Sequence, residues 1–125
     1  MKLLIAVDME GITGVSRWEH VSPGSAEYAR FRALMTEDVN AAISGARSAG
    51  ADQIIVSDGH ADGLNILIEK LDLRATLNSG STSPLAMVQS ADSGLDAALF
   101  IGYHARVGTQ NAILDHTWSG KLIGG

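Results

Sequence analysis

The chain contains no cysteine, and it is poor in proline, in aromatic residues and in positive charge. Without cysteine it has no disulfides or thiolate ligands, so any metal must be bound through oxygen and imidazole nitrogen. Nine lysines and arginines against fourteen acidic residues give a formal net charge of -5. This balance argues against a nucleic-acid partner, which requires clustered positive charge. No apolar run approaches the roughly 20 residues of a membrane-spanning helix, so we expect no membrane association.

Aliphatic residues are abundant, and hydrophobic residues make up 46% of the 125 positions. That fraction excludes a disordered chain, and the length suits one domain with its own core. We therefore expect a single domain over residues 1–125. The first apolar run begins almost at Met1, and neither a basic region nor a separate apolar stretch precedes it. This arrangement favours a cytoplasmic location.

Three short aliphatic runs are bounded by glycine or polar residues, which is typical of buried parallel strands. They lie at residues 3–7, 53–57 and 97–101. Apolar residues at helical spacing predict a long helix from about Ser25 to Ala49, with Ser25 as N-cap and Gly50 as its stop.

Weaker patterns predict several smaller elements. Four leucines and isoleucines share one helical face and indicate a shorter helix after Asp62, and Pro84 is expected to open another helix. We further expect an irregular stretch at residues 15–24 and a short third strand at 75–78. Two extended segments are expected at 112–114 and 117–118, followed by a turn at 119–120 and the start of a further apolar element at 122–123.

The alternation of strands and helices predicts an α/β fold. Its mainly parallel sheet would have right-handed crossovers and helices on both faces, in three layers. The chain ends at Gly125, just after a new apolar pair has begun. We therefore expect a fold truncated at the C-terminus.

Residues able to bind a metal follow each of the three aliphatic runs. Asp8 and Glu10 come after the first run, His60 after the second and His104 after the third. Because the carboxyl ends of parallel strands meet at one edge of a sheet, these four side chains should converge on one crevice. Two close carboxylates raise each other's pKa unless a cation neutralises them. The set predicts a metal site that suits zinc best, with manganese and cobalt as alternatives.

Taken singly, these residues also have ordinary explanations. A carboxylate pair at a strand end is often merely solvated, and a loop histidine is often only hydrogen-bonded. Asp58 either orients a ligating imidazole or serves as a turn or cap residue, and the second role is favoured. His116 is either an edge histidine or, beside a metal crevice, a proton-transfer group. His20 lies in the irregular stretch and is not assigned to the site.

Nearly end to end, the chain resembles the DppA-type D-aminopeptidases, a family of zinc metallopeptidases. The combination of Asp-Met-Glu-Gly-Ile with Gly-Tyr-His-Ala at this separation is specific. The resemblance rests on residues 7–14, 35–37, 58–60 and 100–106 and on the segment around His116.

The resemblance implies a dinuclear zinc site in which Asp8, Glu10, His60 and His104 are ligands and His116 is catalytic. It also implies release of N-terminal D-amino acids, notably D-alanine, from short peptides. Family members assemble as decamers of two stacked five-membered rings, so a homo-oligomer is expected. The family supplies a further glutamate ligand and a C-terminal portion downstream. Residues 1–125 are therefore expected to be the N-terminal, metal-carrying part of a longer family fold.

Two other functions compete with this interpretation. An acidic pair after the first strand also suits magnesium-assisted phosphoryl transfer, with Asp8 as the nucleophile. That reaction needs a cation to hold phosphate, but none of the three lysines follows an aliphatic run, and the two histidines would be unexplained. The third possibility is an inactive, truncated metal-binding domain, for which the abrupt C-terminus is the evidence.

Overall fold

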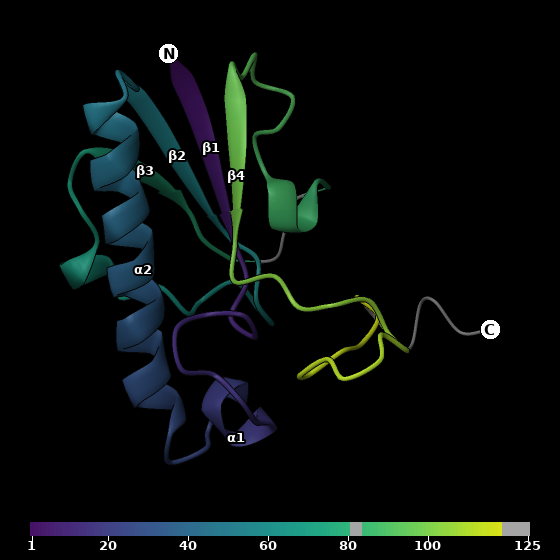
Figure 1. Ribbon diagram of the computed structural model, residues 1–125. Helices are drawn as coiled ribbons and strands as arrows, with labels where there is room; N and C mark the ends of the chain where they lie inside the picture. Colours follow the sequence, from purple (N-terminus) through teal and green to yellow (C-terminus); the bar gives the residue numbers. More distant parts are fainter. Residues whose placement is uncertain (81–83, 119–125) are drawn as a thin grey trace.

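A computed structural model describes residues 1–80 and 84–118 (Figure 1). Strands and helices alternate along the chain, as the spacing of apolar residues predicts. The two elements labelled η are single 3-10 turns. In chain order the elements are β1 (Lys2–Val7), α1 (Trp18–Val21), α2 (Tyr28–Ser48), β2 (Gln53–Asp58), η1 (Ile68–Lys70), β3 (Ala75–Asn78), η2 (Ala86–Val88) and β4 (Ala97–Ile101).

The four strands form one parallel sheet in the order β3-β2-β1-β4. The register aligns the ends of its central strands, because Val7 of β1 pairs with Asp58 of β2 and with Ile101 of β4. The loops that follow these three strands therefore leave the sheet at the same edge (Figure 1). This alignment brings the three candidate ligand segments together.

Helix α2 covers one face of the sheet. Its buried residues Phe31, Met35, Val39 and Ile43 form a core with alternate residues of β1 and β2, namely Leu3, Ile5, Val7, Ile54 and Val56. The turn η2 lies on the opposite face, against the ends of β1 and β2 (Figure 1). The predicted α/β fold with helices on both faces is thus confirmed, although η2 is a single turn.

Helix α2 begins later than its sequence predicts. Its first residue is Tyr28, and the Ser25 hydroxyl donates a hydrogen bond to the carbonyl of Glu19 instead of capping the helix. The predicted stop is confirmed, because Gly50 adopts a φ of +96°, which glycine takes up without a steric penalty. The stretch expected to be irregular contains the short helix α1.

The prediction of a helix after Asp62 is wrong. Leu64 and Ile68 are 63% and 70% exposed, so their spacing does not form a buried helical face, and only the turn η1 is helical. The predicted strand at 75–78 is confirmed as β3, and the helix expected after Pro84 shrinks to η2. The segments 112–114 and 117–118 form no strand, whereas His116 pairs with Arg106 in an isolated parallel bridge. The elements expected at 119–120 and 122–123 lie outside the described residues.

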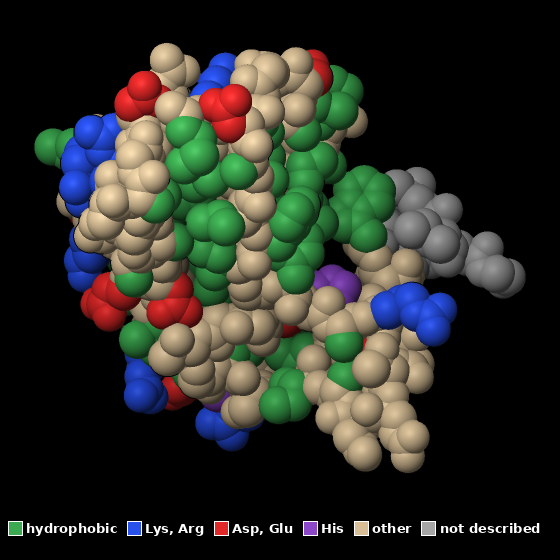
Figure 2. Space-filling view, turned by 45° about the horizontal axis from the view of Figure 1, so that its top comes forward, with side chains coloured by type: hydrophobic (Ala, Val, Ile, Leu, Met, Phe, Trp, Pro, Cys, Tyr) green, Lys and Arg blue, Asp and Glu red, His purple; other side chains and the backbone are tan. Residues whose placement is uncertain are grey.

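Strand β4 lies at one edge of the described sheet, and its outer residues are exposed. Leu99 is 40% and Phe100 61% accessible. Figure 2 shows hydrophobic side chains gathered over this part of the sheet, beside α2. Among the described helices, none has the length and apolar character needed to cross a membrane.

Candidate metal centre

Asp8 and Glu10 lie immediately beyond the end of β1 and are only 2% and 5% exposed. The loop after β4 packs directly against them. The amide of Asp8 donates to the carbonyl of Ile101 at 2.8 Å, and the amide of Gly11 donates to the carbonyl of Gly102 at 2.7 Å. Two glycines allow this approach, because a Cβ on Gly11 would lie 2.9 Å from the Tyr103 carbonyl oxygen, and Gly102 has a φ of +69°.

His60 completes a compact cluster with these two carboxylates. It follows β2 and is 8% exposed. Its Nδ1 atom lies 3.3 Å from Asp8 Oδ1 and 3.3 Å from Glu10 Oε2. One candidate ligand atom from each of the three residues lies within 4.8 Å of the others. Three donors at this separation can coordinate a single ion.

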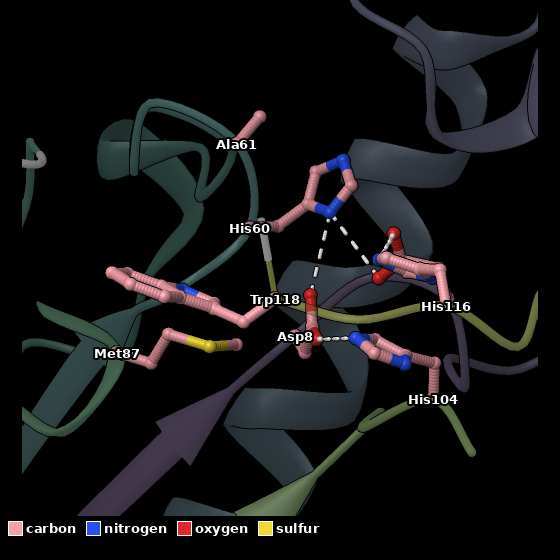
Figure 3. Close-up of a pocket in the computed structure, with 9 residues that line it drawn as sticks. Asp8, His60, Ala61, Met87, His104, His116 and Trp118 are labelled. Atoms are coloured by element: carbon pink, nitrogen blue, oxygen red, sulfur yellow. Dashed lines mark hydrogen bonds and ion pairs between the residues drawn. The ribbon is translucent and has the colours of Figure 1, made fainter. Parts of the chain in front are cut away.

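His104 and His116 face the same carboxylates from a different direction. His104 Nε2 is 3.8 Å from Asp8 Oδ2, and His116 Nε2 is 3.8 Å from Glu10 Oε1. The two imidazoles stack with their centroids 3.5 Å apart. All five predicted site residues therefore line one pocket, of about 210 Å³ (Figure 3).

In each of the three imidazoles, the ring nitrogen that points away from Asp8 and Glu10, here called the outer nitrogen, is hydrogen-bonded to a backbone carbonyl. His60 Nε2 pairs with the Val21 carbonyl at 2.8 Å, His104 Nδ1 with Ala105 at 2.8 Å and His116 Nδ1 with Leu114 at 2.7 Å. A carbonyl can only accept, so in the neutral imidazole the proton lies on the outer nitrogen. The lone pair of the other nitrogen then faces Asp8 or Glu10. This is the orientation that a metal ligand requires.

Burial and the carboxylate–imidazole contacts perturb the acid-base properties of the cluster. Burial raises the pKa of Asp8. Burial also acts to raise the pKa of Glu10, but the neighbouring His60 outweighs it and lowers that pKa to about 2. Burial acts to lower the pKa of His60, yet the two carboxylates raise it to about 10. In the absence of a metal, His60 is therefore protonated at neutral pH and partly balances the two acidic groups.

The cluster fits a divalent cation. Glu10 Oε2 is buried and makes no well-formed hydrogen bond with the described residues, although His60 Nδ1 lies 3.3 Å away. Such a poorly satisfied buried carboxylate oxygen is costly, and a metal ion would satisfy it. Two carboxylates with neutral imidazoles also form a donor set that zinc accepts.

The short helix α1 contributes two contacts that the sequence does not reveal. Its Val21 carbonyl holds His60, and the ring of Trp18 packs edge-on against His116 with the centroids 5.2 Å apart. Met87 of η2 and Trp118 line the side of the pocket that faces away from His104 and His116 (Figure 3). The elements α1 and η2 are too short for a repeating apolar pattern, so the sequence did not indicate these contacts.

Asp58 caps none of the described helices, and its carboxylate binds the backbone of the loop that follows β2. Its carboxylate accepts hydrogen bonds from the amides of Asn65 and Ile66 at 2.6 and 2.8 Å and from Asn65 Nδ2 at 2.8 Å. The fully buried Asn65 also donates to the His60 carbonyl and accepts from Tyr28 Oη. This network attaches the loop that carries His60 to α2.

His20, which the sequence leaves unassigned, is absent from the lining of the pocket. It is 6% exposed and stacks on Phe31 with the ring centroids 3.9 Å apart. His20 is therefore a buried residue that packs against the first turn of α2.

The fold and site together define an α/β protein with a candidate metal centre at the carboxyl edge of a parallel sheet. A family model described as D-aminopeptidase, of the M55 peptidases, matches residues 1–124. The chain belongs to this family.

Two comparisons extend this result. A curated D-aminopeptidase from Bacillus subtilis (strain 168) is 40% identical over 117 residues, which cover 94% of this chain and 42% of that protein. A solved structure, described as the Zn-dependent D-aminopeptidase DppA from Bacillus subtilis, a self-compartmentalizing protease, matches with a TM-score of 0.90 and 40% identity. It is likewise covered over 42% of its length, with 94% of this chain aligned. The chain therefore spans less than half the length of the relatives that it matches.

Proposed function

We propose that the protein is a zinc-dependent aminopeptidase that releases N-terminal D-amino acids, such as D-alanine, from short peptides. The observation that carries this proposal is the buried cluster of Asp8, Glu10 and His60, whose ligand atoms lie within 4.8 Å of one another. Membership of the D-aminopeptidase family and the likeness to a Zn-dependent member supply the reaction and the metal.

In this proposal Asp8, Glu10, His60 and His104 hold two zinc ions. Asp8 lies between His60 and His104 and contacts both, so its carboxylate would be shared by the residues that hold the metal. When bound, paired ions of this kind polarise a peptide carbonyl and lower the pKa of a water molecule enough for it to attack. The protein contributes imidazoles whose outer nitrogens are held by backbone carbonyls, so that the other nitrogen of each ring faces the cluster.

His116 is the proposed catalytic residue. Its Nε2 atom faces Glu10, while its side chain remains 31% exposed, in contrast to 9% for His60. A partly exposed imidazole at the edge of the cluster can exchange protons with solvent. We assign to it the transfer of a proton between the attacking water and the departing amine.

Zinc titration and a substrate panel test this function together. The chain should bind zinc and then hydrolyse D-alanyl peptides faster than L-alanyl peptides, and it should leave an aryl phosphate intact. Cleavage of the phosphate ester would favour the phosphohydrolase alternative. Zinc binding without hydrolysis of any substrate would instead indicate an inactive metal-binding domain.

We further propose that the protein forms a homo-oligomer, a decamer by family resemblance, in the cytoplasm. The related solved protein is described as self-compartmentalizing, and the exposed β4 residues Leu99 and Phe100 leave apolar surface available for burial. Light scattering coupled to size-exclusion chromatography measures the assembly directly, and a monomer at micromolar concentration would contradict it.

A further inference from the structure

A second cavity, of about 140 Å³, lies beside the metal centre. Gly59, Ala61, Met87 and Trp118 line both cavities, so the two adjoin along a common wall. Met87 and Trp118 lie together on one side of Asp8, and His104 and His116 lie on the other (Figure 3). A molecule bound at the metal centre can therefore extend into the second cavity past Met87 and Trp118.

The described lining of this cavity presents no free charge. Its residues are three glycines, two alanines, Met87, Trp118 and one acidic residue, Asp58. The Asp58 carboxylate already accepts hydrogen bonds from the amides of Asn65 and Ile66 and from the Asn65 side chain. An occupant therefore meets apolar side chains and backbone, which favour an uncharged aliphatic group.

Two of the glycines in this lining allow a close approach of neighbouring chain segments. A Cβ on Gly59 would lie 3.0 Å from Met87 Cβ, and a Cβ on Gly63 would lie 2.9 Å from the Asp58 carbonyl oxygen. Around Gly80, by contrast, a Cβ would meet none of the described residues within 4 Å. The backbone is thus closely packed at Gly59 and at Gly63, and the amide of Gly80 donates to the Gly63 carbonyl at 2.7 Å.

We propose that this cavity binds the side chain of the substrate's N-terminal residue and selects small or medium aliphatic groups. The inference rests on the proposed function, which places the amino group and scissile carbonyl of that residue at the metal centre. An apolar cavity of about 150 Å³ can hold a benzene molecule, so a volume of this order accommodates a leucine side chain. Each methylene removed from water strengthens binding by about fourfold.

Methionine methyl resonances provide a test that does not depend on catalysis. The chain has four methionines, and labelling their methyl groups with carbon-13 gives four signals. We would titrate the zinc-loaded protein with glycinamide, D-alaninamide and D-leucinamide. D-leucinamide should shift the Met87 signal and bind at least about tenfold more tightly than glycinamide. The signal of Met35, a fully buried residue of α2, should stay in place.

Two variants on the same turn sharpen this test. Met87→Ala removes one wall of the cavity and should weaken the binding of D-leucinamide about fivefold more than it weakens the binding of glycinamide. Val88→Ala changes the adjacent residue of η2, which does not line the cavity, and should preserve the preference. Equal affinities for the three amides, an unmoved Met87 signal or absence of binding would overturn the proposal.

The failure of this inference is distinguishable from the failure of the proposed function. If D-leucinamide binds with a Met87 shift but no peptide is cleaved, the aminopeptidase function falls and the side-chain cavity stands. If D-alanyl and D-leucyl peptides are cleaved with equal kcat/KM in both the original protein and Met87→Ala, the cavity assignment falls and the function stands.

Discussion

The Nε2 atom of His60 lies 2.8 Å from the carbonyl oxygen of Val21, in a helix of only four residues. This contact fixes the proton of the neutral ring on Nε2 and directs Nδ1 toward Asp8 and Glu10. The backbone of α1 thus sets the orientation of a side chain that is almost forty residues distant in sequence. Because a carbonyl provides the contact, side-chain substitution at Val21 would leave it in place.

Replacement of His60 by alanine should weaken zinc binding by at least about 100-fold and abolish metal-dependent release of D-alanine. The variant loses one of three donors in the buried cluster. Calorimetric zinc titration measures the first effect and a peptide assay the second. His20→Gln is the matched control, because His20 is also buried but lies away from the pocket. Unchanged zinc affinity in His60→Ala would remove His60 from the site.

The convergence of the candidate ligands was predictable from sequence because parallel strands of matched register end at a common edge. Asp8, His60 and His104 each follow such a strand, so the strand ends alone indicate that they meet. His116 belongs to no strand, and the resemblance to a family is what pointed to it. The structure brings it to the pocket through stacking on His104 and contact with Trp18.

The missed features depend on contacts without a periodic pattern. The residues Leu64 to Leu71 have helical spacing, but the Asp58 carboxylate binds the amides of Asn65 and Ile66 and holds that segment in a loop. Side-chain hydrogen bonds of this kind compete with helix formation. Helix α1 is likewise too short for periodicity to indicate it.

Zinc binding should release about one proton per protein near pH 7. The pKa of His60 is raised to about 10 in the metal-free fold, and the ring must lose its proton before Nδ1 can coordinate. Zinc affinity should therefore rise about tenfold per pH unit between pH 7 and 9. Calorimetry in buffers with different ionisation enthalpies measures the released proton. A binding enthalpy that is independent of the buffer would contradict this prediction.

The same pair of groups predicts the pH dependence of metal-free stability. The raised pKa of His60 contributes stability that is fully present below its unfolded value of about 6.5 and is lost as the pH rises through 10. The lowered pKa of Glu10 contributes stability that is present above about 4.5 and is lost as the pH falls through 2. Both contributions are fully present between about pH 4.5 and pH 6.5. Urea denaturation with a chelator present should therefore show that this pair stabilises the fold most in that window. In Glu10→Gln the acidic limb of the profile should flatten.

Trp18→Ala should lower kcat by roughly two- to tenfold while zinc affinity stays within about twofold. The Trp18 ring packs edge-on against His116, whereas the candidate metal cluster is formed by Asp8, Glu10 and His60. The aromatic variant Trp18→Phe should recover most of the rate. A loss of zinc affinity equal to the loss of rate would show that Trp18 supports the whole site and not His116 alone.

Asn65→Ala should lower the free energy of unfolding by about 2 to 4 kcal/mol. The change leaves the Asp58 carboxylate and the His60 carbonyl with fewer donors in a buried environment. Tyr28→Phe removes a single hydrogen bond to Asn65 and should cost only about 0.5 to 1.5 kcal/mol. Chemical denaturation measures both values, and equal costs for the two variants would contradict the central role of Asn65.

Gly102→Ala should disrupt the metal centre without altering any ligand. Gly102 follows β4 with a φ of +69°, and an added Cβ would collide with the Asp8 carbonyl oxygen and lie 2.7 Å from Ile12 Cδ1. The Asp8 backbone and the β4 loop must then separate, which moves Asp8 relative to His104. We expect a loss of at least about 2 kcal/mol in unfolding free energy and a weaker zinc affinity.

Gly108→Ala provides the matched control for this last substitution. Gly108 also has a positive φ, of +80°, but a Cβ there would meet no atom of residues 1–80 or 84–118 within 4 Å. The control therefore carries the backbone strain of an alanine at positive φ without the collision at the metal centre. Zinc titration of the two variants separates the two effects. If Gly108→Ala weakens zinc binding as much as Gly102→Ala does, the close approach of the β1 and β4 loops is not what positions Asp8.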